Sequence, residues 1–547
     1  MKKQLLFYLF SLLVLGLLLL MMFASFDYKN DGHLNSFHVL THSDATLLYQ
    51  FSKDFLQHPA CINDWNFGTN FYIFPNLIIM LVMTFLFTNP SFALFSSAVS
   101  LFFLLIFSIN FLFNKVFNGI SKYSLIISNF MLSALIVYAI IIKDFVYITS
   151  NLFSPYHLGA FINSIIGLIL ILSYLKSKHL KNIIFLLVLS VIAIVSDRIF
   201  IVYFIIPVIL TFLTILLFKK YQRRREYLII LLYVIISGCL GYLIHEFIVK
   251  WNILKLDRIP SAPNNTANSF KLFFQNLYII STAHGINILI MSIALISIIF
   301  STIISLRKLF INNQILSGKS ENILVYFLFM FYFLIVVIPA PCIKGIYFDM
   351  STLRYNIFPI YLALLNTGLL FEYFFVNVKN GLKYLAIISI CLVLIYIAFL
   401  SINLNRLNPF SSIAKIRNYY PSLAKSADEL SEKYHVKYGL GCYWDARFIT
   451  VFSKQNVRVN IVKYPFDPVR YTCNSYYYYT DYIKKNPVVY NFVVLNCLDD
   501  TSRIYKIFDR QSIKKVKIDD NEFYLLPDFI LKKDFQTFEP LHKVITN

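Results

Sequence analysis

Apolar segments long enough to cross a lipid bilayer recur along this chain from residue 4 to about residue 401. A membrane-spanning helix needs roughly 20 mostly apolar residues, and charged residues make up only 14% of the sequence. These features exclude an ordinary soluble domain and indicate a polytopic membrane protein. We expect spans near residues 4–24, 73–88, 93–113, 123–142, 158–176, 182–196, 199–218, 226–247, 284–304, 324–342, 355–375 and 382–401.

The first of these segments follows Lys2 and Lys3 and resembles a secretory signal peptide. Its apolar run is too long for that, however, and no convincing small-x-small cleavage site follows it. We therefore expect a retained helix whose N-terminus lies in the cytoplasm.

Lysine and arginine cluster in some connecting segments, as in FKKYQRRRE at 218–226 and NVKNGLK at 377–383. Such clusters face the cytoplasm by the positive-inside rule, which places the loops 248–283 and 343–354 and everything after residue 401 outside. Twelve crossings would return the tail to the cytoplasm. We therefore predict that one apolar stretch between 73 and 157 is re-entrant or split, with 93–122 the first candidate, which gives a bundle of 11 to 13 spans.

The composition changes at about residue 403, where charge-bearing, alternating sequence begins. The segment SLAKSADELSEKYH (422–435) predicts an amphipathic helix, and YGLGCYWDARFITVFS (438–453) is one of several predicted strand regions. We expect a mainly α-helical protein with a transmembrane domain at 1–402 and a small external α/β or α+β domain at 403–547. A disulfide is possible in that tail, with the pairing left open among Cys442, Cys473 and Cys497.

The formal net charge is +21, but the basic residues are spread among membrane-flanking loops and the tail. They form no single basic, aromatic-rich face, so we expect topology signals and attraction to anionic membrane lipids, and no nucleic-acid binding. The tail also contains no nucleophile elbow, Walker loop or dinucleotide fingerprint. The candidate chemistry must therefore come from polar residues near the external face of the bundle.

The first such residue is Asp44, in the external loop at about 25–72. Ser43 suits an N-cap, and apolar side chains recur at helical spacing behind it: Leu47, Leu48, Phe51 and Phe55. Asp44 would then open an amphipathic helix along the membrane surface. Ionisable groups held near the membrane are functional candidates by default, although capping of this helix explains Asp44 equally simply.

The same loop ends in NDWNFGTNFYIFP (63–75), which combines an acid, amides and aromatic rings above the next span. Asp64, Asn70 and Tyr72 can form hydrogen bonds with sugar hydroxyls, and Trp65 offers a stacking face. An interfacial aromatic belt explains the tryptophan and the tyrosine as well, but it explains the acid less well.

Further polar residues fall on the same predicted face. His157 in SPYHLGAF and Asp197 in VSDRIF are candidates for binding the acceptor or the sugar. Arg198 follows Asp197 directly, so a simple ion pair in a helical hairpin is the alternative for this dipeptide. Guanidinium and ammonium groups suit an anionic phosphate, and the candidates for that role are Arg198, Arg258, Lys344 and Arg354.

Taken together, the chain resembles the GT-C superfamily of integral-membrane glycosyltransferases, which includes protein O-mannosyltransferase-like and lipid A aminoarabinose transferase-like enzymes. The resemblance covers most of the chain: an N-terminal span, a long first external loop with an acid near its start, many further spans and an external tail. The phrases NFYIFP, SPYHLGAF, SDRIF, LRYNIFP and YGLGCYWDARFITVFS occur here in the order seen in bacterial members. One departure is that Asp44 stands beside Ser43, where the family often has paired acids.

This resemblance implies transfer of a sugar from a polyprenyl-phosphate donor to a glycolipid, glycan or protein acceptor of the cell envelope, with inversion at the anomeric carbon. Asp44 would act as general base, and the basic candidates would stabilise the leaving phosphate. The enzyme would lie in the bacterial inner membrane with its site and tail in the periplasm. No cofactor is certain, but a divalent metal held by Asp44 and Asp144 is possible, since some members use one.

Two other classes of function stay open at this stage. A lipid or polysaccharide transporter would also have many spans, but it predicts internal repeats and charges near the midplane, and no convincing repeat is seen. A non-catalytic envelope scaffold predicts that Asp44 is dispensable. The sequence specifies neither the sugar, the acceptor nor the oligomeric state.

Overall fold

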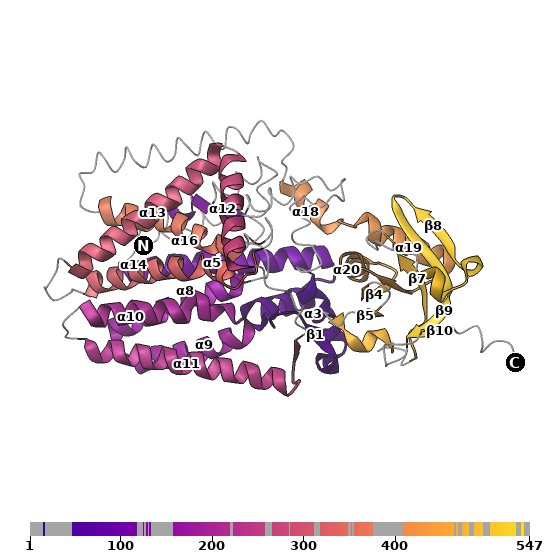
Figure 1. Ribbon diagram of the computed structural model, residues 1–547, viewed down its shortest axis with the longest axis horizontal. Helices are drawn as coiled ribbons and strands as arrows, with labels where there is room; N and C mark the ends of the chain where they lie inside the picture. The colour runs from indigo at the N-terminus through magenta and orange to yellow at the C-terminus, as the bar shows by residue number, and fades with distance from the viewer. Residues whose placement is uncertain are drawn as a thin grey trace.

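The computed structural model describes residues 46–117, 157–218, 223–256, 265–283, 285–310, 318–347, 355–375, 409–463, 467–468, 473–480, 486–495, 504–531 and 538–540, with the isolated positions 15, 16, 124, 127–129, 131, 132 and 352. Within these residues the protein is an elongated helical bundle with a sheet-containing region beyond one end (Figure 1). The predicted boundary near residue 402 falls outside the described residues.

Six helical segments among the described residues are long and apolar enough to cross a membrane. They lie in α5 (Pro90–Val116), α8 (Leu158–Ser177), η4 with α10 (Ile201–Ile205 and Ile206–Phe218), α11 (Arg224–Lys250), α13 (Gly285–Phe310) and α14 with α15 (Gly318–Val337 and Ala340–Ile343). Shorter apolar helices accompany them: α9 (Leu180–Ser196), α16 (Ile357–Phe375) and the segment 73–86. The chain is therefore an integral membrane protein, and its full number of crossings depends on residues outside the described ranges.

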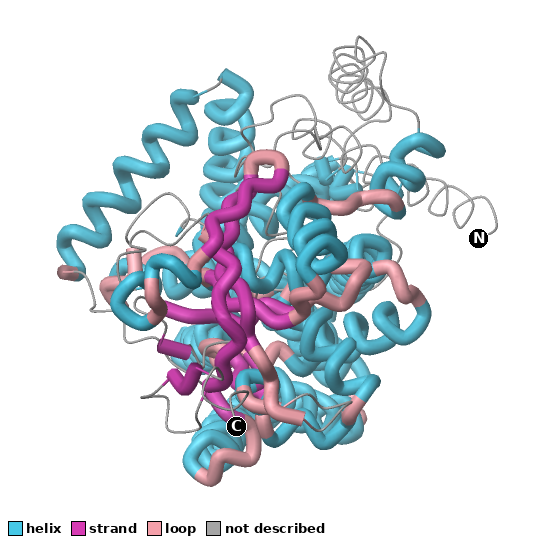
Figure 2. Tube along the Cα trace, turned by 90° about the vertical axis from the view of Figure 1, so that its right-hand side faces the viewer, coloured by secondary structure: helices cyan, strands magenta, loops and turns pink. Residues whose placement is uncertain are grey.

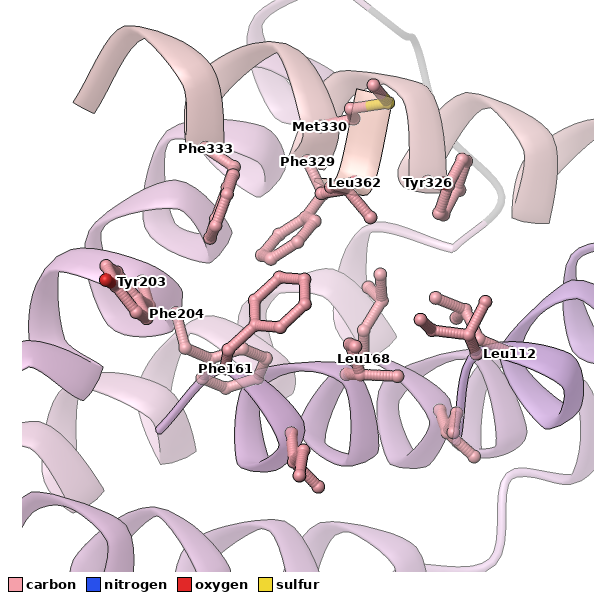
Figure 3. Close-up of a cluster of buried hydrophobic side chains, with 14 of the residues drawn as sticks. Leu112, Phe161, Leu168, Tyr203, Phe204, Tyr326, Phe329, Met330, Phe333 and Leu362 are labelled. Carbon is pink, nitrogen blue, oxygen red and sulfur yellow. The ribbon is translucent and has the colours of Figure 1, made fainter. Parts of the chain in front are cut away.

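Aromatic side chains fill the centre of the bundle, as Figure 3 shows. The ring centroids of Phe161 and Phe333 are 6.0 Å apart, and those of Phe204 and Phe329 are 6.2 Å apart. Lipid tails are as apolar as these side chains, so close packing and interhelical hydrogen bonds hold such helices together. One such bond network joins α13 to α16, where Nδ2 of Asn366 donates to Oγ of Ser301 at 2.7 Å.

The two ends of the bundle are defined by their contacts. At one end, Nη1 of Arg223 donates to Oε2 of Glu321 at 2.6 Å and to the Leu175 carbonyl at 2.8 Å, next to the basic clusters predicted to be cytoplasmic. The same end receives the C-terminus of α5, because Nδ2 of Asn322 donates to the Lys115 carbonyl. The opposite end is where α8 begins and α9 ends, and it faces the tail (Figure 1).

The apolar stretch predicted to cross at 73–88 starts and finishes at that opposite end. It contains η2 (Ile73–Leu77) and α4 (Ile78–Leu86). The preceding Tyr72 N–H donates to the Ser196 carbonyl of α9, and Nδ2 of the following Asn89 donates to the Arg417 carbonyl of the tail. Within the described residues, this segment therefore does not run from one end of the bundle to the other. α5 does so between Pro90 and Val116, so the prediction that 93–122 is the re-entrant stretch was wrong for its described part, 93–117.

The tail contains a sheet with the strand order β10-β9-β7-β3-β4-β5, with β8 paired to β9. The strands are β3 (Tyr438–Gly441), β4 (Arg458–Lys463), β5 (Asp467–Pro468), β7 (Tyr490–Val494), β8 (Lys514–Ile518), β9 (Asn521–Leu531) and β10 (Phe538–Pro540). β3 is parallel to both β4 and β7, whereas β9 is antiparallel to β7. Figure 2 shows the strands running together at this end of the molecule, and the sheet fits the predicted small α/β or α+β region.

Two predictions for the tail can be compared with its structure. The amphipathic helix is present as α19 (Ser422–Tyr434), but the predicted strand at 438–453 ends at Gly441 and continues as α20 (Tyr443–Phe452). Gly439 of this strand permits the close approach of Phe492 in β7, because a Cβ atom at position 439 would lie 2.3 Å from the Phe492 ring. Cys442 is disulfide-bonded and Cys473 is a free thiol, while Cys497 lies outside the described residues.

A second, three-stranded sheet joins distant parts of the chain between the bundle and the tail. Its central strand β1 (Trp65–Phe67) pairs in parallel with β2 (Lys255–Leu256) and antiparallel with β6 (Cys473–Asn474). The first loop, the loop after α11 and the tail therefore meet at one place. This junction lies at the bundle end where α8 begins, and it positions the candidate site.

Candidate functional site

The candidate site lies where η2, the start of α8 and the end of α9 come together. Tyr72 precedes η2 and His157 precedes α8, and both have left-handed backbones with φ of 53° and 54°. Such a conformation costs a non-glycine residue about 1–3 kcal/mol, and residues of this kind cluster at functional sites. The centroids of the two rings are 6.1 Å apart.

A histidine–carboxylate pair forms the centre of this site. Nδ1 of His157 lies 2.7 Å from Oδ2 of Asp197, and the two side chains are only 11% and 4% exposed. The other carboxylate oxygen of Asp197 accepts a hydrogen bond from the Ile199 N–H at 3.2 Å. Because a carboxylate oxygen accepts, Nδ1 of a neutral His157 carries the hydrogen and Nε2 is left as an acceptor.

Two tyrosines lie against this pair. The ring centroids of Tyr355 and Tyr72 lie 5.5 Å and 6.1 Å from that of His157. Burial, followed by the negative charge of Asp197, raises the pKa of Tyr72 well above its usual value. The phenol of Tyr72 therefore stays protonated and can donate a hydrogen bond at any physiological pH.

The backbone around Tyr72 is held by side chains of α8 and α9. Oγ of Ser196 accepts from the Phe74 N–H at 2.9 Å, and Nδ2 of Asn163 donates to the Phe74 carbonyl at 3.2 Å. Ser196, Asn163 and Tyr355 were not among the residues predicted from the sequence. Ser196 directly precedes Asp197 in VSDRIF, and Tyr355 directly follows Arg354 in LRYNIFP. This adjacency to predicted site residues is the one signal in the sequence that pointed to them.

Gly159 permits this close approach of α8 to η2. A Cβ atom at this position would lie 2.4 Å from Oδ1 of Asn76 and 2.8 Å from Cδ of Pro75. We expect Gly159→Ala to destabilise the protein by about 1–3 kcal/mol, because the added methyl group overpacks the contact. Thermal unfolding of the detergent-purified protein would measure the effect.

Gly238→Ala is the matched control, since Gly238 is also helical and its Cβ would meet only Cγ2 of Ile205, at 3.3 Å. Alanine is favoured over glycine inside a helix by about 1 kcal/mol, so this variant should be as stable as the wild type or more so. Equal stability of both variants would show that the α8–η2 contact is not tight.

Arg198 is not paired with its sequence neighbour. Its Nη1 lies 3.5 Å from Oε1 of Glu246 in α11, and the two side chains are 28% and 39% exposed. The simple Asp197–Arg198 pair considered as an alternative is therefore replaced by two pairs that reach other helices. Arg198 directly follows Asp197 in the chain, and its side chain is partly exposed, so it lies at the edge of the site.

The remaining selected residues have different surroundings. Asn70 is buried and Asp64 is half-buried, whereas Lys344 is exposed just after α15. Trp65 is fully buried, and its ring packs edge-on against Phe51 at 5.4 Å, so its face is covered by the protein. Asp44, Asp144, Arg258 and Arg354 lie outside the described residues.

The helix predicted to follow Asp44 is present as α3 (Leu47–Gln57), with Leu47, Leu48 and Phe51 on its buried face. Thr46 occupies the N-cap position, where Ser43 had been expected. Helix α3 therefore begins three residues after Asp44, which weakens capping as the explanation for this acid. No group of three or more potential metal-ligating side chains occurs among the described residues.

No model of a known protein family matches the chain, and no curated protein matches it. Among solved structures, the chain is similar to ArnT from Cupriavidus metallidurans, whose crystal structure is of the apo state. The sequences are 10% identical, the alignment covers 94% of this chain and 97% of that one, and the TM-score is 0.50. The likeness extends over nearly the full length of both proteins, so the chain shares the fold of that structure: a transmembrane helical bundle with a small sheet-containing region near its C-terminus, as predicted.

Proposed function

We propose that this protein is a membrane glycosyltransferase that transfers a sugar from a polyprenyl-phosphate donor to an acceptor of the cell envelope. The observation that carries the proposal is the buried His157–Asp197 pair, set among strained backbones at the loop-bearing end of a GT-C-like bundle. In this proposal the bundle end lies at the outer surface of the cell membrane, where a lipid-linked donor and an acceptor outside the membrane can both reach it.

In the proposed reaction, Asp44 accepts the proton of the acceptor hydroxyl while its oxygen attacks the anomeric carbon. The bond from that carbon to the donor phosphate breaks with inversion, and the electron pair leaves with the phosphate. Positive charge must stand where this negative charge develops, and we assign this role to Arg198, Arg258, Arg354 and Lys344. A bound divalent ion could share it.

The described residues would bind and orient the sugar and the acceptor. Nε2 of His157 can accept a hydrogen bond from a hydroxyl, because Asp197 holds the opposite nitrogen. The protonated phenol of Tyr72 can donate one. Asn70, buried beside Tyr72, and Asp64 complete the proposed set of polar groups.

The test is transfer of a radiolabelled sugar from a panel of polyprenyl-phosphate donors in proteoliposomes that contain envelope lipids. We expect a labelled lipid, glycan or protein product with at least one donor. Movement of the intact donor across the bilayer without any labelled product would instead support a transporter. If no donor in the panel gives a labelled product and none is moved across the bilayer, the proposal is refuted for the panel tested.

A further inference from the structure

A buried ion pair connects the first loop to the tail. Nη2 of Arg458, the first residue of β4, lies 3.1 Å from Oδ2 of Asp54 in α3, and Nη1 lies 3.4 Å from Oδ1. The side chains are 16% and 4% exposed. A guanidinium that reaches both carboxylate oxygens fixes their relative orientation as well as their distance.

Tyr477 of the tail completes this contact. The guanidinium carbon of Arg458 lies 3.3 Å from the centroid of its ring, so Arg458 is held between a carboxylate of the loop and an aromatic face of the tail. We call Asp54, Arg458 and Tyr477 the loop–tail clamp. Burial, and then the positive charge of Arg458, lowers the pKa of the neighbouring Lys53, so loss of Asp54 would leave two repelling cations in a poorly solvated place.

The clamp is part of a larger contact along α3. Leu47 and Leu48 at its start are almost fully buried in one apolar cluster with Ala424, Val451 and Phe452 of the tail. Strand β1 of the loop pairs with β6 of the tail a few residues later. The apolar cluster fixes the helix against the tail by packing, whereas the forked ion pair specifies its rotation and register.

We propose that Arg458 is a positioning residue, which orients α3 through Asp54 and thereby holds Tyr72 at the active site. The proposal rests on the proposed function, because it takes Tyr72 as part of the substrate site. Its physical basis is packing: Leu48 and Phe51 of α3 belong to one buried apolar cluster with Tyr72, so a rotation or shift of α3 displaces Tyr72. A displacement of about 1 Å at a reacting group can cost roughly 100-fold in rate.

Cys61 provides a native reporter of the clamp. Its thiol is fully buried and packs against Tyr477 and Phe55, so it becomes accessible only when the loop and the tail separate. Cys239 lies in the membrane-spanning helix α11 and does not report on the junction, so the rate at Cys61 in the denatured protein serves as the reference. The rate of modification by a maleimide, read at each cysteine by peptide mass spectrometry, would measure opening in the full-length protein.

We expect Asp54→Asn and Arg458→Met each to raise the modification rate of Cys61 by about tenfold or more, since each leaves a buried partner uncompensated. The double reversal Asp54→Arg with Arg458→Asp should bring the rate back to within about threefold of the wild type. The matched control is Glu522→Gln, which breaks the exposed Lys515–Glu522 pair of the β8–β9 hairpin and should leave Cys61 unchanged.

Sugar transfer by the same variants tests the positioning role. We expect kcat to fall about tenfold or more in both single variants, with KM for the donor nearly unchanged, and to recover in the double reversal. Unchanged Cys61 modification in both single variants would overturn the clamp, and faster modification with undiminished transfer would overturn its positioning role. A wild-type protein that transfers no sugar would refute the proposed function, whereas the Cys61 rates would still decide whether the clamp exists.

Discussion

Replacing Asp44 with asparagine is expected to lower sugar transfer by about 10²- to 10⁴-fold, the usual contribution of a general base. Asparagine keeps the size and hydrogen-bonding capacity of aspartate but cannot accept the proton of the acceptor hydroxyl. It is also as good an N-cap as aspartate. Initial rates in proteoliposomes, normalised to the amount of correctly inserted protein, would measure the change.

The competing explanation, helix capping, makes a different prediction for this variant. Helix α3 begins at Leu47 with Thr46 at its N-cap, and an asparagine at position 44 would preserve whatever capping the wild-type residue provides. Ser43→Ala is the matched control next to Asp44, and it should transfer sugar at nearly the wild-type rate. Undiminished transfer by a normally inserted Asp44→Asn protein would refute the assignment of Asp44 as the base.

The fold was predictable where its determinants are local. Long apolar runs predict spans because a bilayer requires length and hydropathy from each helix separately, and α5, α8, α11 and α14 correspond to such runs. The segment 73–86 is apolar too, but it turns back because Tyr72 is bound by Ser196 and Asn89 by the tail. Those partners are more than 100 residues away, so hydropathy alone could not distinguish this segment from a crossing helix.

The same limit applies to the candidate site. The motif VSDRIF drew attention to Asp197 and Arg198, because adjacent charges between apolar segments are costly without a partner or a function. Their partners depend on how four helices cross: Asp197 pairs with His157 of the α8 start, and Arg198 with Glu246 of α11. Trp65 illustrates the opposite case, since an aromatic residue in a polar loop became the centre of a small buried cluster.

The clamp residues were missed for a related reason. Asp54 lies in a polar loop and Arg458 lies in an alternating stretch of the tail, so each is an ordinary charged residue in its local sequence. Only the folded chain, which brings residues 404 positions apart into contact, makes them a buried pair. Charged residues with such a small exposed area are rarely tolerated without a partner. Their burial therefore identifies Asp54 and Arg458 as a pair once the structure is known.

Asp197→Asn is expected to lower transfer by about 100-fold or more while leaving the protein folded. Asparagine can still accept the hydrogen bond from the Ile199 N–H, but its amide can donate to Nδ1 of His157 and so favour the tautomer that carries its hydrogen on Nε2. The nitrogen that faces the ligand would then donate where the wild type accepts, and fixing the wrong tautomer of a catalytic-site histidine is costly in rate. Measured kcat and KM for donor and acceptor would show which substrate depends on this nitrogen.

Glu246→Gln is the matched control for this last prediction, because it removes a carboxylate at the same end of the bundle from the more exposed pair with Arg198. Exposed pairs contribute little, roughly 0–1 kcal/mol, so this variant should keep most of its activity. A structural role of Asp197 predicts a different pattern, in which Asp197→Asn lowers the thermal stability and the amount of folded protein but not the rate per folded molecule. Retention of the wild-type kcat by folded Asp197→Asn protein would therefore remove the His157–Asp197 pair from the mechanism and leave it as a brace between α8 and α9.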